Sequence, residues 1–318
     1  MKKAAVLILF TTILFADSNV SGKVFFNHTT DLGEDGINAF NMKRAYLSYG
    51  NSVSDDVSFK LTYDMGKNES ESAHTAFLKI AMVKWKTNIG DVAIGMQGMN
   101  MFKTMENTWG HRFIAKMPMD TYGFSASADL GVGIIRSFGK TITSALITNG
   151  GGYKKIESDS HKKFSFHTVY GESKLNQKDG FNIGGSFSFE PYDVDSITVD
   201  NTKVMGLFSG FSIGDIRIGG EFDQKITNIT EQIISGYVSY KITEKIEVLV
   251  RMDQYDSDTN YGLEEASDII IGLNYAPEKG FRIAPTLRRT SRSFVMTRDE
   301  GWYENFEKTL VVNFLYVF

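Results

Sequence analysis

The hydrophobic pattern of this chain has a period of two over much of its length. In residues 57–63, Val57, Phe59, Leu61 and Tyr63 alternate with serine, lysine and threonine. The same alternation recurs in residues 181–189, 216–222, 246–252 and 268–275. Because successive side chains of a strand point to opposite faces, this pattern predicts β-strands with one apolar face and one hydrated face.

The connections between these strands fall into two length classes. Seven short turns lie at residues 51–56, 87–91, 137–141, 175–180, 212–215, 242–245 and 276–280. Eight longer polar stretches alternate with them, at residues 29–38, 66–74, 98–128, 149–163, 190–202, 224–232, 253–267 and 288–307. Fifteen connections predict sixteen strands, with 14 and 18 as the alternatives. This segregation is typical of a transmembrane antiparallel up-and-down β-barrel of the bacterial outer membrane. A β-sandwich or a propeller has no reason to sort its connections in this way.

Composition agrees with an exported, all-β protein. The 318 residues include 30 glycines, four prolines and no cysteine, and aromatic residues make up 13%. The absence of cysteine excludes a disulfide framework and a thiolate metal site. Lys2 and Lys3 precede a short apolar run, which predicts a signal peptide at residues 1–16 that is cut after Ala16. Residues 17–318 are expected to form a single domain.

The final strand is apolar up to the last residue. Leu310, Val312, Phe314, Tyr316 and Phe318 share one face of it. In a closed barrel this strand pairs with the first strand, at residues 21–29, so its outward face meets lipid. The ending resembles the C-terminal signal that the barrel-assembly machinery of outer membranes reads. A buried strand of a soluble sheet is the alternative, but it does not explain the sorted connections.

With these features placed, the chain resembles Gram-negative outer-membrane porins, nearest to the phosphate-selective porin O and P type group. The resemblance lies in residues 21–33, 40–66, 123–134 and 145–153 and in the closing strand. It implies a homotrimer of sixteen-stranded barrels in which the long third loop, residues 97–127, folds into the lumen as a constriction. The phosphate-selective relatives have a ladder of basic residues in the lumen, whereas the inward faces here mix basic and acidic residues.

Charged residues on the strands are predicted to face the water-filled interior. An Arg or Lys that faces lipid at mid-depth costs roughly 2–4 kcal/mol, so these positions are expected to point inward. The predicted wall positions are Arg44, Lys60, Asp64, Arg217, Glu221, Asp223, Arg251, Asp253, Asp268, Arg282, Thr286 and Arg288. They are expected either to hydrate the lumen or to set a transverse field that sorts solutes.

The third loop carries charges of its own. Glu106, Arg112, Lys116 and Asp120 are the predicted constriction residues, with Glu106 and Asp120 opposing Arg44 and Lys60 across the opening. The aromatic residues of this loop, Trp109, Phe113 and Tyr122, are predicted to pack it against the wall.

These features together predict a porin: a channel for passive diffusion of ions and small hydrophilic solutes, with no catalytic activity. Its expected partners are outer-membrane lipid and lipopolysaccharide. The net charge of −4 disfavours nucleic acid. The five histidines lack metal-ligand spacing, so neither a metal nor a cofactor is expected. Two alternatives stay open, a barrel enzyme of the phospholipase or protease kind that uses His167, and an adhesive or structural barrel.

Overall fold

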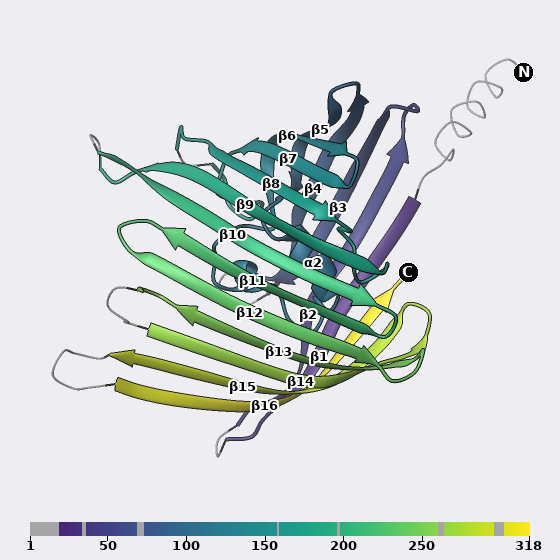
Figure 1. The fold of residues 1–318 in the computed structure, drawn as a ribbon, viewed down its shortest axis with the longest axis vertical. Helices are drawn as coiled ribbons and strands as arrows, with labels where there is room; N and C mark the ends of the chain where they lie inside the picture. The colour runs from purple at the N-terminus through teal and green to yellow at the C-terminus, as the bar shows by residue number, and fades with distance from the viewer. Residues whose placement is uncertain are drawn as a thin grey trace, which may run out of the picture.

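The computed structural model describes residues 19–33, 36–68, 73–157, 159–195, 198–259, 264–295 and 302–318. The predicted signal peptide lies outside these ranges. Sixteen antiparallel strands follow one another around a closed barrel in chain order, and β1 pairs with β16 (Figure 1). This arrangement confirms the predicted strand number and the pairing of the first strand with the last.

The strands are β1 (Asn19–Asp31), β2 (Asn38–Ser52), β3 (Val57–Lys67), β4 (His74–Thr87), β5 (Gly90–Gly98), β6 (Ala128–Phe138), β7 (Thr141–Thr148), β8 (Lys163–Gly171), β9 (Gly180–Asp193), β10 (Val199–Ile213), β11 (Ile216–Ile226), β12 (Thr230–Lys241), β13 (Ile246–Asp256), β14 (Glu264–Glu278), β15 (Phe281–Val295) and β16 (Trp302–Val317). Two short helices, α2 (Lys103–Trp109) and α3 (Pro118–Thr121), lie between β5 and β6. Among the described residues, no helix is long and apolar enough to cross a membrane.

The barrel closes where the chain ends. Gly22 of β1 and Phe318 exchange two backbone hydrogen bonds, of 2.9 and 3.1 Å. The ring of Phe318 lies over Gly22, where an added Cβ would come within 2.3 Å of the ring. A larger residue at this position would therefore displace the terminal aromatic ring.

Side chains alternate between the two faces of the wall, as the period of two predicts. In β11, Arg217 and Glu221 are buried inside the barrel, whereas Ile218 and Phe222 are exposed on its outer face. The outer face is therefore largely apolar, and the polar residues point to the interior.

Six of the eight predicted long loops are much shorter in the structure. The predicted loop at 224–232, for example, is strand except for residues 227–229. The prediction was wrong here because the strands continue into segments that are polar on both faces, where alternation of hydrophobicity no longer marks a strand. Two connections are long as predicted, residues 99–127 and residues 149–162.

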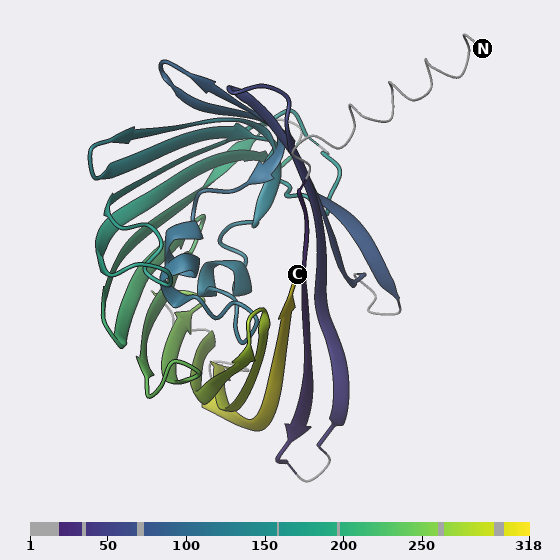
Figure 2. The same ribbon diagram turned by 90° about the vertical axis from the view of Figure 1, so that its right-hand side faces the viewer.

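The connection at residues 99–127, here called the β5–β6 segment, contains both helices. Figure 2 shows these helices within the ring of strands. The helix α2 ends at Gly110, which adopts a left-handed φ of 73° and donates its backbone N–H to the carbonyl of Glu106. Pro118 begins α3, a position that suits its fixed φ.

Candidate functional site

An apolar core holds the β5–β6 segment against one side of the barrel wall. Seven buried side chains of the segment contact buried side chains of β8, β10, β12, β13 and β14. The segment contributes Met101, Phe102, Met105, Trp109, Met117, Met119 and Phe124, and the wall contributes Val169, Val204, Phe208, Ile233, Tyr237, Leu249 and Ile270. This side of the barrel interior is therefore packed like the core of a soluble domain.

Glycines of β10 let the segment approach this wall closely. An added Cβ at Gly210 would lie 2.6 Å from Thr108 Cγ2, and one at Gly206 would lie 2.8 Å from Met119 Cε. Both positions are inward-facing in a strand that the segment covers. Glycine in a strand interior often marks such a close approach, so this signal was present in the sequence but was not used there.

Polar contacts add to the apolar anchoring. The Arg251 guanidinium lies 5.1 Å from the Trp109 ring centroid and donates to Asp253 at 2.9 Å. Arg217 donates to Glu247 at 3.0 Å and to the carbonyl of Trp109 at 3.4 Å. Both arginines are buried, and a buried charge is stable only with a partner of opposite charge. Each guanidinium has such a carboxylate partner in the wall, and each also contacts the segment.

The three aromatic residues predicted to pack the segment all contact the wall. Trp109 is only 1% exposed and belongs to the apolar core described above. Tyr122 stacks on Tyr255 at 4.1 Å between ring centroids. Phe113 lies in a second apolar cluster with Phe25 of β1 and Ala284 of β15, so the segment also reaches the strands on either side of the barrel closure.

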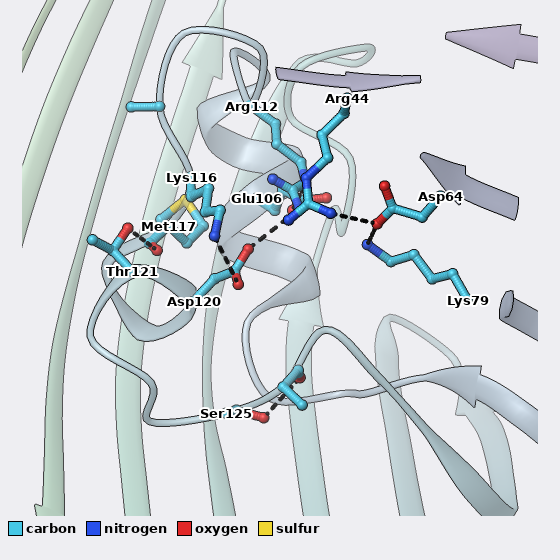
Figure 3. A network of polar contacts seen from close by, with 12 residues as sticks. Arg44, Asp64, Lys79, Glu106, Arg112, Lys116, Met117, Asp120, Thr121 and Ser125 are labelled. Carbon is cyan, nitrogen blue, oxygen red and sulfur yellow. Dashed lines mark hydrogen bonds and ion pairs between the residues drawn. The ribbon is translucent and has the colours of Figure 1, made fainter. Parts of the chain in front are cut away.

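The four predicted constriction residues form one ion-pair network within the segment (Figure 3). Arg112 lies between Glu106 and Asp120, at 3.1 and 3.3 Å from their carboxylates. Lys103 pairs with Glu106 at 2.6 Å, and Lys116 pairs with Asp120 at 3.7 Å. Glu106 and Asp120 were predicted to oppose Arg44 and Lys60, but their ion pairs are made with residues of their own segment.

This network shifts the protonation equilibria of its members. Burial of Glu106 favours the protonated acid, but Lys103 and Arg112 outweigh that effect, so the pKa of Glu106 is lowered. The pKa of Arg112 is raised: burial opposes its charge, but the surrounding tyrosine and carboxylate groups stabilise it. Both residues are therefore ionised at neutral pH.

A second network lies on the facing wall and is centred on Asp64 (Figure 3). The Asp64 carboxylate accepts hydrogen bonds from Arg44 at 3.0 Å, Lys79 at 3.4 Å and Tyr153 at 2.7 Å. Lys79 Nζ also lies about equally far from the rings of Tyr46 and Tyr153, at 5.1 and 5.0 Å. Asp64 itself is completely buried, so its charge is enclosed by these donors.

Between the segment and this wall lies an open cavity of about 630 Å³. Its walls come from the segment, from strands β1 to β8 and from β16. The charged side chains that line it are Lys23, Lys60, Lys79, Lys103, Glu106 and Arg112. The barrel interior is thus divided into a packed half, mainly along β8–β14, and an open half, mainly along β1–β7, and β8 borders both.

The predicted wall positions divide between these halves. Arg44, Lys60 and Asp64 lie on strands of the open half. Arg217, Glu221, Asp223, Arg251, Asp253 and Asp268 are buried in β11, β13 and β14. On β15, Arg288 donates to Asp268 at 2.6 Å and Thr286 donates to the carbonyl of Val311 at 3.1 Å. Arg282 of the same strand lies opposite Leu315 of β16.

Two lysines of the open half were missed from the sequence. Lys23 shares a face of β1 with Phe25, so alternation alone could have placed it inside. Lys79 sits where the pairing of β3 with β4 shifts register, between Thr62 and Tyr63. A bulge of this kind changes the face on which the following residues lie, so a strict period of two cannot place Lys79.

His167, the candidate of the enzyme alternative, is buried in β8 against the segment. Its Nε2 lies 2.9 Å from Thr104 Oγ1, and its ring stacks on Phe208 at 5.3 Å. The Nδ1 atom has no hydrogen-bond partner among the described residues. A nucleophile–histidine–acid arrangement needs a group that orients the ring through this second nitrogen, and the described residues place none there.

In the described part of the chain, no group of three or more His, Asp or Glu side chains is arranged to hold a metal ion.

Comparison with known proteins finds similar structures but no similar sequences. No protein-family model matches the sequence, and no curated protein sequence matches it. Among solved structures, an anion-selective porin from Comamonas acidovorans is similar, with a TM-score of 0.72 and 12% identity over 95% of this chain and 99% of that chain. OmpF of Salmonella typhi, in complex with daunomycin, gives a TM-score of 0.67 and 13% identity over 95% and 97%. OprB of Pseudomonas putida gives a TM-score of 0.68 and 9% identity over 97% and 96%. At such identities, the likeness establishes that this chain has the sixteen-stranded barrel fold of these outer-membrane proteins.

Proposed function

We propose that this protein is an outer-membrane porin, a water-filled channel for passive diffusion of ions and small hydrophilic solutes. The β5–β6 segment is its constriction. One observation carries the proposal: the segment packs against β8–β14 and leaves a charged, open cavity along β1–β7. A sixteen-stranded barrel is wide enough to leave an aqueous lumen, and a segment anchored to one side narrows the lumen without filling it.

The similar structures support this proposal, because they include an anion-selective porin and an outer-membrane protein. One of them, OmpT of Vibrio cholerae, is described in a trimer form, and we propose a homotrimer for this chain as well. The finer assignment to the phosphate-selective group rests on the resemblance of residues 21–33, 40–66, 123–134 and 145–153 and of the closing strand. In this proposal the apolar outer face contacts outer-membrane lipid and lipopolysaccharide. The closing strand is read by the barrel-assembly machinery, and a signal peptide at residues 1–16 directs export.

Single-channel recording in planar lipid bilayers tests this function. The refolded protein, shown by circular dichroism to be rich in β-structure, should give discrete and reproducible conductance steps. Folded barrels that insert into the bilayer but conduct no current would contradict the proposal.

A lipid-hydrolysing or proteolytic barrel is less well supported, because His167 lacks an orienting partner among the described residues. The same refolded protein should release no fatty acid from labelled phospholipid. Hydrolysis that disappears in His167→Ala but persists in His28→Ala, a histidine outside the apolar core, would favour the enzyme.

A further inference from the structure

We propose that the open half of the barrel selects small inorganic anions. This inference rests on the proposed channel function and adds the class of solute. Five basic side chains line the cavity, namely Lys23, Lys60, Lys79, Lys103 and Arg112, whereas Glu106 is the one acidic side chain among its lining residues.

The acidic groups near this cavity are already paired. Glu106 lies between Lys103 and Arg112, and Asp120 lies between Arg112 and Lys116. Asp64 is completely buried beneath Arg44 and Lys79. Within the two networks and the cavity lining, seven basic residues therefore face three acidic ones, and each acidic residue has two basic partners.

Two lysines keep their charge available to solute. Lys23 and Lys60 both line the cavity, and neither forms an ion pair with a described residue. They also lie at different depths. Lys23 pairs with Tyr46, which pairs with Asp64, and Lys60 is four residues nearer the β2–β3 turn. At ~3.3 Å per residue, this offset separates the two positive charges by about 13 Å along the strand direction.

Most of the other buried acidic residues of the strands lie away from the cavity. In β11–β14 the buried acidic side chains are Glu221, Asp223, Glu231, Glu247, Asp253 and Asp268. The apolar core of the β5–β6 segment lies against these strands, so these carboxylates are not among the residues that line the cavity. A solute that passes through the open half meets the lysines at contact distance, and a ring of basic side chains attracts anions and repels cations.

The reversal potential in a potassium chloride gradient measures this preference, because the two ions have nearly equal mobility in water. The wild-type channel should favour chloride. Lys23→Gln and Lys60→Gln should each lower the anion-to-cation permeability ratio roughly sixfold or more, because one charge at about 4–8 Å in water changes the local concentration of each ion about two- to sixfold, in opposite directions for the anion and the cation. Lys140→Gln is the matched control: it removes one lysine from the exposed β6–β7 turn, outside the cavity lining, and should leave the ratio unchanged.

The outcomes separate the two proposals. Wild-type steps with cation preference, or with no preference, would overturn anion selection and leave the channel function intact. Anion preference that is unaffected by both cavity variants would overturn the assignment to these lysines. Absence of any conductance step overturns the channel function, and anion selection falls with it.

Discussion

Strands β1–β4 and strands β11–β14 face the same barrel interior, but their inward side chains differ in charge and in what covers them. The buried charged side chains of β11–β14 are mostly acidic, with six carboxylates and two arginines, and these strands lie beneath the β5–β6 segment. The inward charges of β1–β4 are mostly basic and meet an open cavity. One half of the interior is packed like a protein core, and the other half is open and lined by charged side chains.

This difference shows that an inward charge on a barrel strand does not by itself mark a pore. Arg251 and Lys60 both obey the same alternation. Arg251 is 1% exposed and contacts Trp109 and Asp253, whereas Lys60 lines the cavity. The position of the segment decides which of the two residues lies in the open cavity.

The largest effect is expected from removing the segment. Replacement of residues 101–124 by a short Gly-Ser linker takes away seven apolar core residues and the ion-pair network of Glu106 and Arg112. The strands remain paired around the closed barrel, so the conductance should rise several-fold. The measurement is single-channel recording beside the wild type. A barrel of unchanged conductance would show that the segment does not restrict the passage.

Stability should respond differently to the loss of an arginine in each half. Arg251→Met leaves Asp253 buried without its cation, which should lower the free energy of unfolding by about 3 kcal/mol. Arg44→Met, the matched change in the open half, should cost less than about 1 kcal/mol, because Arg44 is partly exposed and Asp64 keeps Lys79 and Tyr153. Urea unfolding in detergent micelles checks both values, and equal losses would refute the distinction.

The smallest effect is expected from acidification. Because the pKa of Glu106 is lowered, its carboxylate contributes to stability above its unfolded pKa, and this contribution is lost as the pH falls through the folded value. Protonation also removes the one acidic group from the cavity lining, so anion preference should increase well below pH 4.5. Reversal potentials at acidic and neutral pH measure this change. Glu106→Gln should have the higher preference at neutral pH and a smaller increase on acidification than the wild type.

The sequence was sufficient to predict the barrel, but it predicted the candidate site only in part. Alternation and connection lengths predicted sixteen strands, because both follow from a wall with one apolar and one hydrated face. They could not assign Arg217 and Lys60 to different environments, because that depends on how the β5–β6 segment folds over the wall. Lys79 was missed for a local reason, since a register shift interrupts the period of two on which the prediction depends.

The central claim is that solutes pass on one side of the β5–β6 segment. The chain has no cysteine, so a single introduced thiol reports on its own position. Ser48→Cys places a thiol in the open cavity, and Ser235→Cys places one in the packed half, where Ser235 is 4% exposed beside Asp253. A charged thiosulfonate reagent added during single-channel recording should reduce the current through Ser48→Cys and leave Ser235→Cys unchanged. Block of Ser235→Cys with no effect on Ser48→Cys would contradict the account.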